Sequence, residues 1–264
     1  MKKLIFFLFV STLFIFSSCD DDAVLGDTST VNLNFTAVFS GDPLVFQNSE
    51  YQYKYPAGNQ IMFSDLKFFI SEVALLEEEG GDEAELIDIQ NVNFSNNTTL
   101  AEAERAISFS LPNIPSGKYK ALKIGIGVPA DLNNENYSQY GENHPLRKNS
   151  GEYWSGWQSF IFMKINAVYD IDSNDIGNGT DASLGHHLGG NQFYKIISLS
   201  KPITLEPDQE INLDIELDLA KLYESQSGEY LDLTNSDHFS THDQSKVGVI
   251  TFLTNNYERA FTLK

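Results

Sequence analysis

The sequence predicts an all-β protein, an antiparallel β-sandwich or partly closed barrel with a short C-terminal helix. Most apolar stretches alternate with polar residues in steps of two, which is typical of strands with one buried face. Turns rich in Gly, Pro, Asn and Asp separate these stretches at the spacing of sandwich and barrel folds. Only residues 246–261 place apolar side chains near helical spacing without alternation, so we expect a short helix there, packed on the sheet.

The first predicted strand covers residues 31–39, and a Ser-Gly-Asp-Pro turn at 40–43 ends it. Residues 60–76 form a long apolar-rich stretch, which we interpret as one strand bent near Ser64-Asp65. A charged loop at 77–83 follows, and residues 113–118 are typical of a hairpin turn. The remaining predicted strands are 84–89, 102–110, 119–128, 158–169, 192–199 and 210–217.

The N-terminus predicts a lipoprotein signal peptide over residues 1–18. A basic head is followed by an apolar run that is too short for a transmembrane helix. Cys19, the chain's one cysteine, lies where cleavage would make it the first mature residue, so we predict that it is lipidated. A triacylated cysteine anchors firmly because each buried methylene contributes about 0.8 kcal/mol. A plain secreted protein with one spare thiol is the alternative.

Residues 19–30 form the predicted tether, and residues 31–264 form one domain. The acidic triplet Asp20–Asp22 resembles the export signal of surface lipoproteins in Bacteroidetes-type bacteria. We therefore expect an outer-membrane lipoprotein at the cell surface. A solvated tether that carries no export signal, with the domain on the periplasmic face, is the alternative.

The charge of the chain limits the classes of partner. Losing residues 1–18 removes two lysines and no acid, so the net charge changes from −20 to −22. Such a surface repels phosphates, which argues against a nucleic-acid partner. One cysteine allows neither an internal disulfide nor a thiolate metal cluster. The sequence also lacks G-x-S-x-G, H-E-x-x-H and P-loop motifs, and we expect no enzymatic activity.

Residues 144–190 contain most of the side chains that can carry chemistry. Three of the five histidines and both tryptophans of the chain lie there. An acidic turn in the same stretch, with Asp170, Asp172, Asn174 and Asp181, has oxygen spacing similar to a calcium loop. Position six of that loop is Asp175 rather than Gly, so we interpret it as a solvated hairpin tip.

Several segments together resemble the MbnP-like family of copper-binding proteins, which are associated with methanobactin operons. The resemblance extends from about Val31 to the C-terminus. Thr241-His242 also matches its pattern. This chain has YWSGW where a tighter W-x-W is usual, and it lacks the cysteine pair of some members. The resembling segments are 66–75 (LKFFISEVAL), 111–133 (LPNIPSGKYKALKIGIGVPADLN), 153–157 (YWSGW), 187–189 (HLG) and 255–263 (NNYERAFTL).

The resemblance implies a β-rich domain that binds one copper ion through imidazoles. In some members a partner di-haem enzyme of the MauG type oxidises a nearby tryptophan to kynurenine. We expect His144 and His187 to be ligands, with His242 as a third ligand and His186 as a substitute for His187. Imidazole suits copper, and two neutral imidazoles make a good Cu(I) site. Each histidine could instead be a solvated loop residue.

The two tryptophans have different expected roles. Trp157 opens an apolar strand and is expected to lie in the core, whereas Trp154 precedes that strand and is expected beside the metal. The predicted function is thus a surface-anchored copper-binding lipoprotein for copper capture or handling. The alternative is a surface β-sandwich module that binds a glycan or a partner protein, with Tyr153, Trp154 and Trp157 as a stacking platform. A third possibility is the same fold with a decayed metal site.

Overall fold

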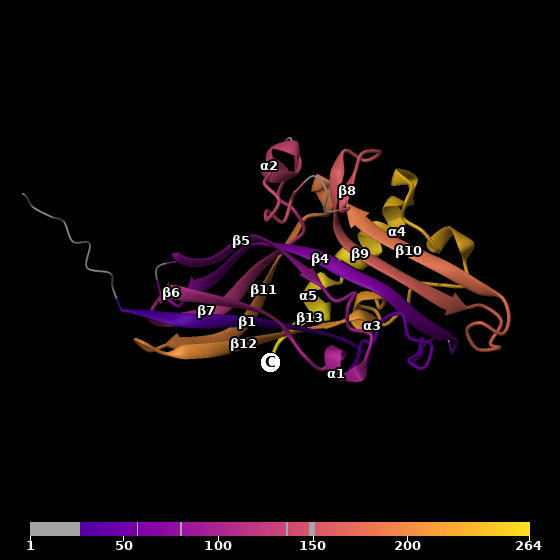
Figure 1. Cartoon of the computed structure of the whole chain (residues 1–264), viewed down its shortest axis with the longest axis horizontal. Helices are drawn as coiled ribbons and strands as arrows, with labels where there is room; N and C mark the ends of the chain where they lie inside the picture. Colours follow the sequence, from indigo (N-terminus) through magenta and orange to yellow (C-terminus); the bar gives the residue numbers. More distant parts are fainter. Residues whose placement is uncertain (1–26, 57, 80, 136, 148–150) are drawn as a thin grey trace, which may run out of the picture.

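The computed structural model (Figure 1) describes residues 27–264 except 57, 80, 136 and 148–150. The predicted signal peptide, Cys19 and the acidic triplet lie outside the described residues. None of the helices in the described part of the chain has the length and apolarity needed to cross a membrane.

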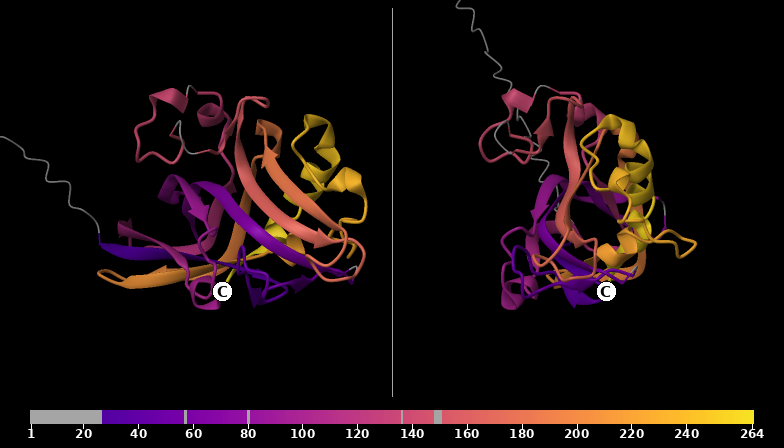
Figure 2. Two further views of the ribbon diagram at one scale, coloured as in Figure 1. Left: turned by 45° about the vertical axis from the view of Figure 1, so that its right-hand side comes forward. Right: turned by 90° about the vertical axis from the view of Figure 1, so that its right-hand side faces the viewer.

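Two β-sheets pack face to face and do not close into a barrel (Figures 1 and 2), as the predicted sandwich requires. The first sheet has the order β13-β12-β1-β2, and β6 also pairs with β1. Its pairs are antiparallel except β1 and β12, which run parallel. The strands are β1 (Thr28–Phe39), β2 (Asp42–Pro43), β6 (Ile107–Pro115), β12 (Glu210–Asp218) and β13 (Phe261–Leu263).

The second sheet is organised around the long strand β4 (Gln60–Glu77), with the order β10-β9-β4-β7-β11. The register of β4 with β9 shifts between Phe63 and Asp65, which confirms the bend predicted near Ser64-Asp65. One side of β4 pairs with β9 and then with β7, while β5 pairs along the other side. The other strands are β3 (Tyr53–Lys54), β5 (Glu83–Asn93), β7 (Gly117–Ile126), β8 (Tyr153–Trp154), β9 (Ser159–Asp170), β10 (Asp181–Gly189) and β11 (Lys195–Leu205).

The core lies between the two sheets. Val31, Leu33, Phe35 and Ala37 are buried because alternate residues of β1 point to the same face. The Phe35 ring meets Phe68 of β4 edge-on, with centroids 6.3 Å apart. The apolar residues that alternate in the sequence of β1 are therefore the ones that pack against the second sheet.

Short helices cover the ends of the sandwich. The single helix predicted over 246–261 is two helices, α4 and α5, with β13 following directly (Figure 2). The break falls at Asn256. Its side-chain amide donates to the backbone carbonyls of Leu222 and Phe252, at the junction of the two helices. The helices are α1 (Leu100–Ala103), α2 (Ala130–Asn133), α3 (Leu219–Leu222), α4 (Val247–Thr254) and α5 (Tyr257–Ala260), with 3₁₀ turns η1 (Tyr137–Gln139), η2 (Asn191–Phe193), η3 (Ser236–His238) and η4 (Gln244–Lys246).

Some predicted boundaries are wrong for identifiable reasons. The strand predicted from residue 102 begins at Ile107, because Thr99 and Glu102 form a capping box that starts α1. The strand predicted over 192–199 begins at Lys195 and continues to Leu205, since η2 occupies the preceding residues. The hairpin turn predicted over 113–118 is wrong, because β6 pairs with β1 in the first sheet and β7 pairs with β4 and β11 in the second, so that Ser116 connects the two sheets. Strand β10 was not predicted at all, since its sequence SLGHHLG is rich in glycine and lacks β-branched residues.

Candidate functional site

Strand β10 places its two adjacent histidines on opposite faces of the second sheet. His186 is completely buried. Its Nε2 lies 2.7 Å from the His238 carbonyl and its Nδ1 lies 2.8 Å from the Tyr223 hydroxyl. A carbonyl only accepts, so Nε2–H donates to it and Nδ1 accepts from Tyr223. Both ring nitrogens are engaged, which leaves His186 no free nitrogen for the substitute-ligand role expected from the sequence.

We expect the buried His186 to make folding sensitive to acid. Burial lowers its pKa to about 4, below the value of about 6.5 in an unfolded chain. The unfolded state therefore binds a proton first as the pH falls below about 6.5, and stability is lost between that pH and about 4. Between pH 7.5 and pH 5 the loss is on the order of 1–2 kcal/mol. Urea unfolding of the wild type and of His186→Gln at both pH values measures it.

The difference between the two proteins in this loss of stability removes the contribution of the many carboxylates, because both proteins carry them. The wild type should lose more stability than His186→Gln over this interval. Equal changes in the two proteins would contradict a neutral buried His186.

His187, on the other face of β10, has one engaged ring nitrogen and one unengaged. Its Nε2 lies 3.0 Å from the Asn166 Oδ1, so Nε2–H donates and Nδ1 carries the lone pair. Nδ1 is buried and has no hydrogen-bond partner among the described residues. Burial, with further contributions from His242 and Lys164, lowers the pKa of His187 to about 3. The ring is therefore neutral near pH 7, with an inward lone pair that no described protein group uses.

A short segment, residues 239–241, is hydrogen-bonded to β10 and positions His242 beside this ring; we call this segment the strap. The buried Thr241 hydroxyl accepts from the His187 backbone N–H and donates to the His187 carbonyl, both at 2.7 Å. The imidazoles of His187 and His242 consequently lie with centroids 4.4 Å apart. Gly185 leaves room for the His242 ring in this position, because a Cβ at residue 185 would lie 2.8 Å from the His242 Nε2. Burial and the charge of Lys164 lower the pKa of His242.

Two indoles cover the histidine pair. Residues 154–157 form a turn between β8 and β9, and the rings of Trp154 and Trp157 stack with centroids 5.2 Å apart and planes at 6°. Trp154 contacts both imidazoles, with centroids 4.9 Å from His242 and 5.6 Å from His187. Trp157 lies over Gly189, where a Cβ would be 3.4 Å from the indole. The YWSGW turn and the HLG strand end are therefore parts of one site.

The family model for MbnP matches residues 28–243. The chain belongs to the MbnP family. That family is associated with copper and methanobactin. MbnP from Methylosinus trichosporium is a similar solved structure, with 14% identity and a TM-score of 0.47 over 79% of this chain and 82% of that one. A search of the curated proteins found no match.

His144 does not join the His187–His242 pair in this MbnP-family chain. Its ring stacks on Tyr140 with centroids 4.0 Å apart, and its Nδ1 accepts the Leu146 N–H. It lines a separate hollow beside β5 and β6. Where the structure describes the chain, no group of three or more His, Cys, Asp or Glu side chains could hold a metal. The expected His144–His187 pairing is corrected to His187–His242.

Polar neighbours that we did not predict surround the pair. Lys164 and Asn166 are the polar positions on one face of β9, and Lys164 lies opposite His187 in the register with β10. The Lys164 Nζ is 3.6 Å from an Asp65 oxygen, and Lys67 is 3.8 Å from the same atom. Two polar residues in an otherwise apolar strand were the available signal. They became interpretable only once the strand register was known.

The acidic turn after β9 closes its own hairpin. The Asp170 carboxylate accepts two backbone N–H groups of the turn, at 3.1 and 2.8 Å. Asp172 and Asp181 each accept one more, both at 2.8 Å. These contacts support the interpretation of the calcium-like spacing as a hairpin tip.

Proposed function

We propose that the chain binds one copper ion through His187 and His242, beneath Trp154 and Trp157, for copper capture or handling outside the cell. The observation that carries the proposal is the buried Nδ1 of His187, which lacks a hydrogen-bond partner among the described residues, in a ring whose centroid lies 4.4 Å from that of a second imidazole. A buried acceptor without a partner costs roughly 1–3 kcal/mol, so such an atom calls for an explanation. A metal ligand is one such explanation.

The donor set favours copper, and Cu(I) in particular. Imidazole is a good copper ligand, and copper is bound most strongly among the divalent first-row metals. Two imidazoles suit Cu(I), which accepts few ligands, and among the described residues no third His, Cys, Asp or Glu completes a metal-binding group with them. Bound copper would supply a redox-active cation at this position. His187 and His242 would hold it, and the two indoles would exclude water and offer their faces to the cation.

The proposal includes the location and the partner. We expect lipidation at Cys19, which with the acidic triplet that follows would tether the protein at the outer membrane. The domain then acts as a non-catalytic copper carrier. Trp154, which contacts both imidazoles, is the tryptophan best placed for oxidation to kynurenine by a di-haem MauG-type enzyme.

Metal titration of the purified mature protein tests the proposal. Copper should be retained at about one ion per chain after dialysis against a mild chelator, in the presence of a reductant, and zinc should not displace it. Absence of retained copper with a folded protein would overturn the proposal. After co-expression with a di-haem peroxidase, intact mass should show one carbon replaced by one oxygen, and peptide mapping should assign the change to Trp154.

A further inference from the structure

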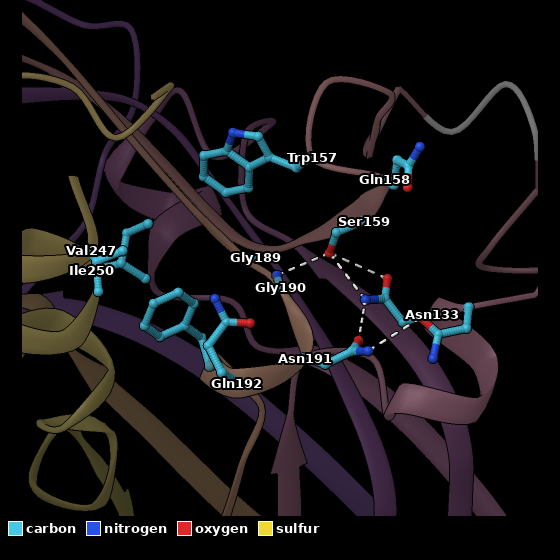
Figure 3. A pocket seen from close by; sticks show the side chains of 12 residues that line it. Asn133, Trp157, Gln158, Ser159, Gly189, Gly190, Asn191, Gln192, Val247 and Ile250 are labelled. Atoms are coloured by element: carbon cyan, nitrogen blue, oxygen red, sulfur yellow. Dashed lines mark hydrogen bonds between the residues drawn. The ribbon is translucent and has the colours of Figure 1, made fainter. Parts of the chain in front are cut away.

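A pocket of about 460 Å³ opens beside Trp157 (Figure 3), and neither His187 nor His242 lines it. It lies between α2, the turn that precedes β9, η2 and α4. Every residue that lines it is uncharged. Its volume lies within the range of sites for small ligands.

Three segments of the family resemblance end at this pocket. Asn133 ends the 111–133 segment, Trp157 ends YWSGW, and Gly189 ends HLG, and all three line the pocket. Copper binding uses His187, His242 and the Trp154 face of the indole pair. It assigns no role to Asn133 or to the opening in front of Trp157. The pocket is thus a second feature built from the same segments.

Buried polar side chains hold the polar wall of the pocket in place. Asn133 is 3% exposed and Ser159 is 2% exposed. The Asn133 amide accepts the Phe160 N–H at 2.8 Å and donates to the Asn191 Oδ1 at 2.6 Å. Figure 3 shows the bond between Asn133 and Asn191. Asn191 in turn donates to the Asn134 Oδ1 at 3.2 Å. These three amides are therefore positioned before any ligand arrives, which reduces the entropy lost on binding.

The two walls of the pocket differ in chemistry. Trp157 and Val247, whose side chain is 47% exposed, form an apolar wall. Asn134, Gln158 and Gln192 present primary amides, each of which can both donate and accept. Gly189 allows close packing against the Phe160 backbone, because a Cβ there would lie 2.6 Å from the Phe160 carbonyl. The pocket therefore combines a flat aromatic surface with paired donors and acceptors.

We propose that this pocket binds one pyranose ring of a neutral glycan, with a C–H face of the ring on the Trp157 indole and vicinal hydroxyls on the amides. A hydroxyl both donates and accepts, as an amide pair requires. A charged ligand would enter a lining without a counter-charge, which is unfavourable. The net charge of −20 further disfavours anionic sugars. A glycan-binding module was the alternative function left open by the sequence, and here it coexists with a metal site.

The test uses metal-free mature protein and the methyl glycosides of glucose, galactose, mannose and N-acetylglucosamine. Saturation-transfer NMR and calorimetry measure binding. At least one glycoside should bind with a Kd of about 0.1–10 mM, in the range of a single small ligand. Val247→Trp fills the pocket and should weaken binding by about tenfold or more. Ile196→Trp, at a site 54% exposed outside the pocket lining, is the matched control and should bind as the wild type does.

Asn134→Ala with Gln192→Ala removes rim amides without a bulky group, and this variant should also weaken binding. Binding of none of the glycosides, or equal binding by wild type and Val247→Trp, would overturn the proposal. So would binding of the uncharged peptide N-acetyl-trialanine amide in place of the sugars. Copper retention should be unchanged in all these variants, and His242→Ala should leave sugar binding unchanged, so the two proposals fail separately.

Discussion

His187→Ala should abolish copper retention, whereas His144→Ala should leave it unchanged. The first change removes the buried, unpartnered Nδ1 from the ring that lies beside His242. We expect affinity to fall by more than about 100-fold, beyond the loss typical when only an orienting group is removed. The second change removes a ring that stacks on Tyr140 and accepts the Leu146 N–H, away from the pair. Chelator competition, followed by metal analysis of the protein, measures both.

A variant of the second expected ligand distinguishes loss of a copper ligand from misfolding. His187 is only 9% exposed, so its replacement disturbs packing, whereas His242 is exposed and its ring makes no hydrogen bond among the described residues. His242→Ala should therefore keep the fold, as judged by circular dichroism, and still lose copper. Copper retained by both variants, or lost from His144→Ala, would remove the pair from the metal site.

The fold was predictable where one face of a strand is buried. Period-two alternation predicted β1, because burial of one face imposes that pattern locally. A long apolar-rich stretch predicted most of β4, with its bend near Ser64-Asp65. Strand β10 was missed because its glycines oppose strand formation. Its stability comes from pairing with β9 and from hydrogen bonds between Gly185 and the strap at Phe239 and Thr241. Those partners lie far away in sequence, and no local propensity reports them.

The sequence predicted most of the residues of the site, but not how they are arranged in space. Trp154, His187 and His242 were expected near one another, and they are. His144 was placed with them because the family resemblance implied a copper site built from imidazoles. The β8–β9 turn instead carries Trp154 over β10, while His144 packs on the β5 and β6 side. Asn166 was missed because its contact with His187 depends on the register of two strands, which the sequence does not display.

Asn166→Leu should weaken copper binding by roughly 10- to 100-fold while leaving both imidazoles present. Asn166 accepts the His187 Nε2–H at 3.0 Å, which keeps the proton on Nε2 and the lone pair on Nδ1. Leucine has a similar size and no acceptor, so the proton is free to move to Nδ1 and the ring is free to turn. Chelator competition gives the affinity, and histidine ¹⁵N shifts give the tautomer in the metal-free protein.

Asn166→Asp separates this orienting role from simple packing. A carboxylate still accepts the Nε2–H, and its charge makes the imidazole more basic, so copper binding should equal or exceed that of the wild type. Asn212→Leu on β12, in the other sheet, is the matched control for replacing an amide on a strand and should not alter copper binding. If Asn166→Leu bound copper as tightly as the wild type, the tautomer of His187 would not depend on Asn166. Equal weakening in Asn166→Asp and Asn166→Leu would show that the amide acts by packing, because only the leucine variant lacks an acceptor.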